Sequence, residues 1–96
     1  MNYSVVFEPM FHENRDYTDR GFNVTLANQV YVSVKFGFGS YSDGGDTTAE
    51  VAVIDKDNNW YVFSNGKLIP NPDGSEVNSH ITPDQLADIM YLAKQL

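Results

Sequence analysis

Apolar and polar residues alternate along the chain from position 22 to position 38. The even-numbered apolar residues are Phe22, Val24, Leu26, Val30, Val32, Val34, Phe36 and Phe38. A period of two is typical of β-strands with one buried face. The alternation continues through 27–29, so this stretch fits either one long bent strand or two strands joined by a turn. Because strands usually have about five or six residues, we predict a hairpin.

A second group of strands is predicted between Thr48 and Ile69. Residues 48–54 alternate again, with Ala49, Val51 and Val53 on one face, and the polar residues 55–59 form a turn before the chain resumes as a strand at 60–63. Asn65-Gly66 predicts a hairpin, because both residues tolerate the positive φ angles of a type I′ turn. The sequence therefore indicates an antiparallel meander.

The end of the sequence has the pattern of a capped amphipathic helix. Thr82 is placed to cap it, Pro83 suits its first position, and Gln85 completes a capping box. Ile81 and Leu86 have the spacing of a hydrophobic staple. Apolar residues at helical spacing are Leu86, Ile89, Met90, Ala93 and Leu96. We predict that this face packs on the sheet.

These elements predict an α+β fold: an antiparallel β-sheet of about four to six strands with one C-terminal α-helix packed across it. The 96 residues fit a single globular domain spanning 1–96. The segments 10–21 and 70–75 are polar or rich in turn residues and are predicted to be loops. Without cysteine, a secretion signal or a long apolar run, the expected location is the cytoplasm.

The charge is strongly negative. Thirteen Asp and Glu residues against six Lys and Arg give a formal net charge of −7. Five of the acids fall within fifteen residues and are opposed there only by Lys56. They are Asp43, Asp46, Glu50, Asp55 and Asp57. A field of this sign repels nucleic acid and attracts basic partners, so direct nucleic-acid binding is not expected.

Two short segments resemble ligand-binding loops but fail at required positions. Residues 55–59 have the first three ligand positions of a calcium loop, but Trp60 stands where glycine is needed and Gly66 where a bidentate Glu is needed. The glycines in 37–42 are followed by a predicted strand, whereas a phosphate loop is followed by a helix. We therefore expect neither a metal nor another cofactor.

No catalytic constellation is apparent. His12 and His80 are the only histidines, and nothing marks one of the serines as a nucleophile. The pair Asp43 and Asp46 needs a cleft for acid–base work, and a solvated loop is the simpler interpretation. The chain is therefore not expected to be an enzyme.

The aromatic residues divide into two predicted groups. The expected core residues are Phe36, Trp60 and Phe63, and the residues off the main apolar register are Tyr31, Tyr41 and Tyr61. Exposed tyrosine among acids is typical of a protein-binding face. The alternative is that these tyrosines are also buried, because a helix can cover either side of the sheet.

Four segments carry a resemblance to a known class of proteins: Ser33–Gly37, Thr48–Val53, Trp60-Tyr61 and Ile81–Pro83. In this order they resemble small proteins carried by bacteriophages and prophages, over about two thirds of the chain from Tyr31 onward. Small acidic phage proteins include anti-CRISPR proteins and other inhibitors of host defence. The resemblance implies no catalytic residues.

The expected function is therefore that of a non-enzymatic inhibitor that binds a basic surface of a host protein, such as a CRISPR effector, and occludes it. The predicted partner-binding residues are Tyr41, Asp43, Asp46, Glu50, Asp55 and Asp57. The alternatives are a structural or accessory phage protein that self-associates and, less favoured, a small enzyme or metal-binding module.

Overall fold

The fold is an antiparallel sheet with one helix on one face, as the sequence predicts. The computed structural model describes residues 6–9, 21–36 and 48–96. The elements are β1 (Val6–Pro9), β2 (Gly21–Thr25), β3 (Tyr31–Lys35), β4 (Ala49–Ile54), β5 (Trp60–Ser64), β6 (Lys67–Asn71), β7 (Asn78–Ile81) and α1 (Pro83–Ala93). Strands β1 to β6 follow one another in chain order, and β7 pairs with β4 outside that path. The α+β prediction is confirmed.

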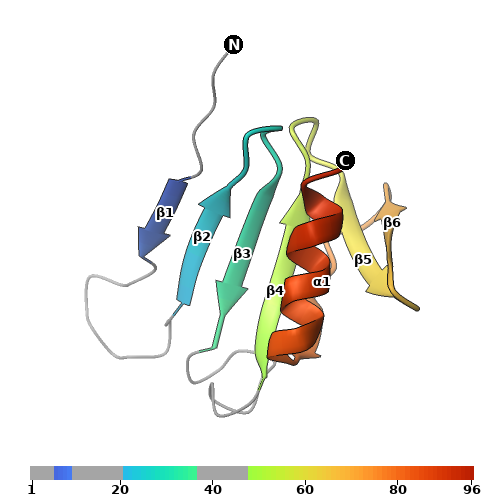
Figure 1. Cartoon of the computed structure of the whole chain (residues 1–96). Coiled ribbons are helices and arrows are strands. Elements are labelled where there is room, and N and C mark those ends of the chain that lie inside the picture. The colour runs from blue at the N-terminus through green and yellow to red at the C-terminus, as the bar shows by residue number, and fades with distance from the viewer. Residues whose placement is uncertain (1–5, 10–20, 37–47) are drawn as a thin grey trace.

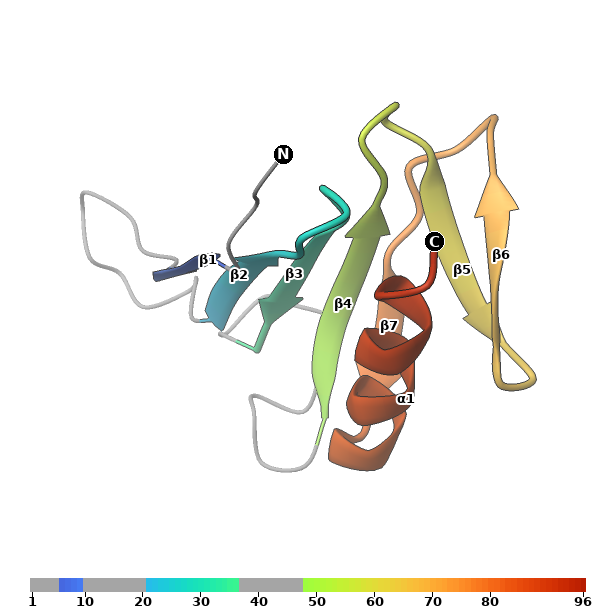
Figure 2. The ribbon, with the colours of Figure 1, turned by 45° about the horizontal axis from the view of Figure 1, so that its top comes forward.

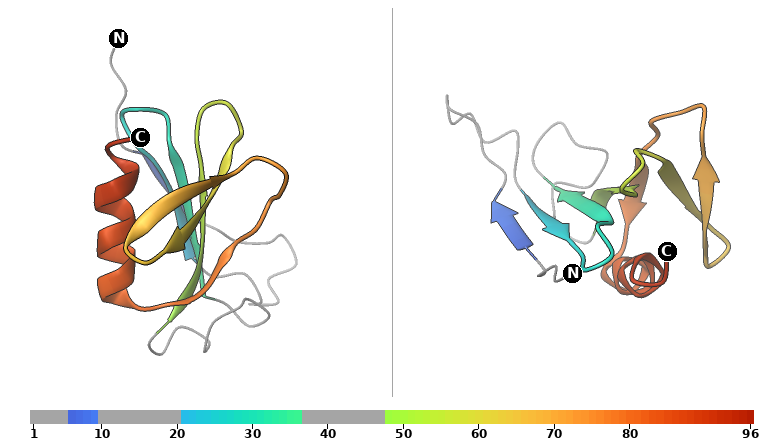
Figure 3. Two further views of the ribbon diagram at one scale, coloured as in Figure 1. Left: turned by 90° about the vertical axis from the view of Figure 1, so that its right-hand side faces the viewer. Right: turned by 90° about the horizontal axis from the view of Figure 1, so that it is seen from above.

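Helix α1 lies across the sheet in front of β4 (Figure 1). The β5–β6 hairpin turns away from the plane of β2, β3 and β4, and the helix lies in the corner between them (Figures 2 and 3). The helix also contacts β6. The concave side of the sheet therefore holds the core.

The core combines alternating apolar residues of the strands with apolar residues from β7 and α1. Its buried members are Val24, Leu26, Val30, Val32, Val34, Val51, Val53, Ile81, Ile89 and Ala93. Val24 lies opposite Val32, and Val32 lies opposite Val53, so these side chains form a row across three strands. Cross-strand rows of β-branched residues stabilise a sheet. Ile89 of the helix, which is 0% exposed, belongs to the same buried cluster.

Strand β4 is shared by two partners along one edge. Its beginning pairs with β7, where Ala49 lies opposite Ile81, and its end pairs with β5, where Val53 lies opposite Tyr61. We call the point between these two pairings the fork. Asn78 lies there, 7% exposed. It is the only buried polar side chain among the described residues.

The Asn78 amide replaces ladder hydrogen bonds at the fork. Its Nδ2 donates to the Val51 carbonyl at 3.1 Å and to the Tyr61 carbonyl at 3.3 Å, and its Oδ1 accepts from the Phe63 amide at 2.9 Å. Buried backbone groups need partners. One side chain therefore satisfies three backbone groups of two strands where those strands diverge.

The helix begins as predicted. The Thr82 hydroxyl accepts from the Gln85 amide at 3.2 Å, and the Thr82 amide donates to the Gln85 side chain at 2.9 Å. Pro83 is the first helical residue. Both halves of the capping box are thus formed, and Ile81 and Leu86 both belong to the core assembly.

Replacing Thr82 with Ala should lower the free energy of unfolding by about 0.5–2 kcal/mol. The substitution removes the acceptor for the Gln85 amide at the helix start. Urea denaturation of the variant measures the effect, with Ser79→Ala, an exposed strand position, as the matched hydroxyl control. Equal midpoints for the two variants would show that the cap contributes nothing.

Several sequence-based assignments differ from the structure. Strand β7 was not predicted, and β6 continues through Asn71 into the segment expected to be a loop. Leu96 lies beyond the helix and is 45% exposed, so it is not part of the packed face. Val53 in the core pairs with Tyr61, whereas Trp60 pairs with Ile54. Tyr61, predicted off the core register, therefore packs against the core, and Trp60 belongs to the opposite face.

Candidate functional site

The predicted partner-binding residues divide into three groups. Tyr41, Asp43 and Asp46 lie outside the described residues. Glu50 is near the start of β4, with Lys35 as its cross-strand neighbour. The remaining two acids, in the turn between β4 and β5, are separated from Glu50 by the length of β4, roughly 17 Å at 3.3 Å per residue. The described acids therefore lie at two ends of the sheet.

Asp55 organises the turn between β4 and β5. Its Oδ1 accepts from the amides of Asp57 and Asn59, each at 2.9 Å. Its Oδ2 accepts from the Asn59 side-chain amide at 3.1 Å and from the Tyr61 hydroxyl at 2.9 Å. An ionised carboxylate has about four acceptor positions, and three are used by the turn and one by Tyr61 of β5. The Asp55 carboxylate thus holds the loop in shape.

These contacts change two pKa values. Burial acts to raise the pKa of Asp55, but hydrogen bonds from Asn59, Tyr61 and Asp57 outweigh it, and the pKa lies below its ordinary value. Burial raises the pKa of Tyr61, and its hydrogen bond to Asp55 and the nearby negative charges act in the same direction. Both shifts favour the ionised carboxylate and the neutral phenol. The turn is therefore stable in this form at neutral pH.

The turn between β2 and β3 has the same geometry as the turn between β4 and β5. In the first, the Leu26 amide donates to the Val30 carbonyl and Gln29 has a φ of 69°. In the second, the Asp55 amide donates to the Asn59 carbonyl, and Asn58 has a φ of 67°. This combination is typical of a type I turn followed by a bulge residue at positive φ. Both turns lie at the same end of the sheet, where α1 also ends (Figure 1).

Asn28 ties the first of these turns to the end of the helix. Its Nδ2 donates to the Ala93 carbonyl at 2.8 Å and to the Leu96 carbonyl at 3.3 Å, and its Oδ1 accepts from the Val30 amide at 3.2 Å. The last carbonyls of a helix have no partner within the helix. The Asn28 side chain therefore caps the C-terminal end of α1 from a distant part of the sequence.

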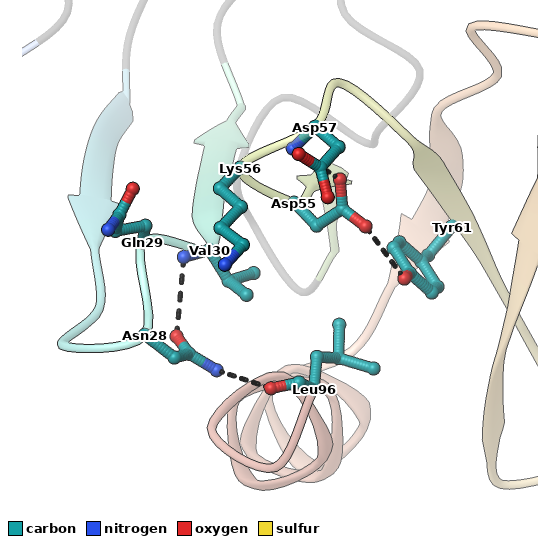
Figure 4. Close-up of a pocket in the computed structure, with 8 residues that line it drawn as sticks. All are labelled: Asn28, Gln29, Val30, Asp55, Lys56, Asp57, Tyr61 and Leu96. Carbon is teal, nitrogen blue, oxygen red and sulfur yellow. Dashed lines mark hydrogen bonds between the residues drawn. The ribbon is translucent and has the colours of Figure 1, made fainter.

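The two turns and the helix end surround a hollow of about 490 Å³ (Figure 4). Its lining comprises Asn28, Gln29, Val30, Asp55, Lys56, Asp57, Tyr61 and Leu96. Figure 4 shows the Lys56 side chain running from the second turn to a point beside Val30, and Tyr61 on the opposite side of Asp55 from Lys56. This hollow is the candidate functional site, because it contains the two described acids of the predicted turn beside amides and an aromatic ring.

The charged groups of the hollow have different roles. Asp57 and Lys56 are exposed. Among the described residues, no hydrogen bond or ion pair engages the Asp57 carboxylate or the Lys56 ammonium. Asp57 contributes only its backbone amide to the turn, so its carboxylate is available to a partner. Of the two predicted acids here, the structure uses Asp55 internally and presents Asp57.

The remaining sequence-based expectations concern metal ligands, the histidine on β7 and membrane spans. Within the described part of the chain, no three His, Asp or Glu side chains are grouped as metal ligands. His80 lies on β7 with a φ of 53° and is exposed. No helix in the described residues is long and apolar enough to cross a membrane.

Sequence reasoning missed the roles of Asn28 and Asn78, and it singled out Tyr61 but placed it off the core register. The turn at Asn28 could be predicted locally, because Asn is common in turns. No sequence pattern predicts its hydrogen bond to the Ala93 carbonyl, 65 positions away. Tyr61 was assigned to the wrong face. The chain matches no family model, no curated protein and no solved structure.

Proposed function

We propose that this chain is a non-enzymatic protein-binding inhibitor of the anti-CRISPR kind, acting in the host cytoplasm. Its partner is a host defence effector with a basic nucleic-acid-binding surface, and its mechanism is occlusion of that surface. The observation that supports this proposal best is the rigid turn that presents Asp57. Because Asp55 fixes the turn through four internal hydrogen bonds, little conformational entropy is lost when a partner binds it.

Net charge supports the same conclusion. A charge of −7 steers a basic partner toward the chain and speeds association at low salt. The predicted acids Asp43 and Asp46 add to this field wherever they lie. Effectors of the CRISPR type hold nucleic acid in positively charged channels, and an acidic domain of this size competes for such a channel.

A triple variant tests the mechanism: Asp43→Asn, Asp46→Asn and Asp57→Asn together. Asp55 is left intact because its carboxylate stabilises the turn. Surface plasmon resonance on a CRISPR effector, or on a partner recovered from host lysate, should show association slowed about tenfold at low salt, with a flatter salt dependence. Tyr41→Ala should instead raise the dissociation rate.

The matched control removes three acids elsewhere: Asp73→Asn, Glu76→Gln and Asp84→Asn. These residues are exposed and lie outside the hollow. If both triple variants slowed association equally, the effect would be due to net charge alone and not to these particular acids. Effector already loaded with target nucleic acid should no longer bind the wild-type chain. Unhindered binding to the loaded effector would contradict occlusion.

Self-association is the competing function, and Ile69 and Tyr91 give it a specific basis. They are 48% and 63% exposed, high values for large apolar side chains. Sedimentation equilibrium at physiological salt distinguishes the two functions: we expect a monomer, since two copies of charge −7 repel each other. A stable oligomer that does not bind a basic partner would favour the structural role.

A further inference from the structure

We propose that the hollow at the end of the sheet receives an arginine side chain of the protein partner. This inference rests on the proposed function and specifies which chemistry the partner presents. Three properties of the hollow support it: a free carboxylate, an aromatic and apolar wall, and additional acceptor positions nearby.

The free carboxylate is that of Asp57. It is exposed, lies at the rim of the hollow (Figure 4) and is not used by the turn. The adjacent Asp55 carboxylate has its acceptor positions filled but keeps its charge. Two negative charges thus face one positive charge, that of Lys56, in the lining. A guanidinium pairs with a carboxylate through two parallel hydrogen bonds, which an ammonium cannot do.

The remaining lining suits the rest of an arginine side chain. The Tyr61 ring and Leu96 supply apolar surface for the methylene groups. The Asn28 Oδ1 accepts one bond from Val30 and retains a second lone pair. A guanidinium has five N–H donors, so it can reach Asp57 and still use such an acceptor. At about 490 Å³ the hollow is large enough for one side chain and water.

Substitution of Lys56 distinguishes a positively charged ligand from a negatively charged one. The Lys56 side chain lies beside Val30 in the lining of the hollow, and no hydrogen bond or ion pair from a described residue engages its ammonium group. If the ligand is a cation, Lys56 opposes binding and its removal should strengthen it. If the ligand is an anion, Lys56 is the main contact and its removal should abolish binding. One substitution therefore separates the two chemistries.

The test is an NMR titration of the full chain with N-acetyl-arginine methylamide, with the lysine analogue and acetate as comparison probes. We expect saturable shifts at the backbone amides of 28–30 and 55–57, stronger for the arginine probe. Lys56→Gln should tighten binding about two- to fivefold, and Asp57→Asn should weaken it about tenfold or more. Asp73→Asn, which changes the charge equally at a distant exposed site, should have no effect.

Opposite outcomes would overturn the inference. Chemical shift changes that acetate produces and that Lys56→Gln abolishes would show that the hollow binds anions. Equal effects of Asp57→Asn and Asp73→Asn on arginine binding would show that only the net charge of the chain matters. Lys56→Gln keeps the test valid if Asp57→Asn unfolds, because misfolding cannot tighten binding. The probe needs no host protein, so arginine binding without capture of any effector would refute the proposed function and retain this site.

Discussion

Replacing Asn78 with Ala should lower the free energy of unfolding by about 2–4 kcal/mol, the largest effect expected for any polar side chain described here. The substitution leaves the Phe63 amide and the carbonyls of Val51 and Tyr61 without their partner at the fork. A buried group without a partner costs about 1–3 kcal/mol, and water entering the vacated space recovers part of the sum. Urea denaturation monitored by circular dichroism measures the loss.

Asn78→Asp separates hydrogen bonding from packing volume. Aspartate has nearly the same shape and can still accept from the Phe63 amide, but its second oxygen faces two carbonyls and cannot donate to them. We expect a loss at least as large as that of Asn78→Ala, and one that diminishes at acid pH as the carboxyl is protonated. Ser79→Ala, at the exposed neighbouring position, should change stability by no more than about 0.5 kcal/mol. A fully stable Asn78→Ala variant would show that the fork does not depend on this amide.

Replacing Asp55 with Ala should cost about 1–3 kcal/mol at pH 7. The variant loses the four hydrogen bonds that close the turn between β4 and β5, and hydrogen bonds to a charged group are stronger than neutral ones. Partial exposure of the turn lets water replace some of them. Asp57→Ala, two residues further along the turn, removes no side-chain hydrogen bond among the described residues and should cost about 0.5 kcal/mol or less.

The cost of Asp55→Ala should depend on pH in a defined direction. The folded pKa of Asp55 lies below its ordinary value, so the carboxylate stabilises the fold fully above the unfolded pKa of about 3.9. That contribution is lost as the pH falls below this value and through the folded pKa. The difference between wild type and variant should therefore be constant from pH 7 to about pH 5 and shrink at lower pH. Denaturation midpoints at several pH values check this, and a difference that grows on acidification would contradict the hydrogen-bonded role.

The local features of this protein follow from short stretches of sequence. The helix start depends on Thr82, Pro83 and Gln85, which are close along the chain and satisfy one another's backbone groups. The Asn65-Gly66 turn has φ angles of 52° and 75°, as that dipeptide predicts. Alternation across 22–36 places the valines in the core. Each of these depends on neighbours within a few residues, so the sequence is sufficient.

The sequence of β5 alone does not show which face of the strand is buried. Trp60, Tyr61, Val62 and Phe63 are all suited to a buried strand, and their apolar character does not show which pair faces the core. The phase is set by the five-residue turn before them, which places Tyr61 opposite Val53. A shift of one residue moves every side chain to the other face. Sequence reasoning therefore identified the strand and misassigned Trp60 and Tyr61.

The α+β class, the capped helix and most strands could be predicted from sequence, because periodicity and capping are properties of neighbouring residues, and the net charge follows from composition. The roles of the buried and turn-forming polar side chains became visible only in the folded arrangement. Asn78 reaches carbonyls 17 and 27 positions away, and Asn28 reaches a carbonyl 65 positions away. The hollow likewise exists because two similar turns and a helix end meet at one end of the sheet. Such contacts between distant residues depend on how the elements pack in space, which no local sequence pattern encodes.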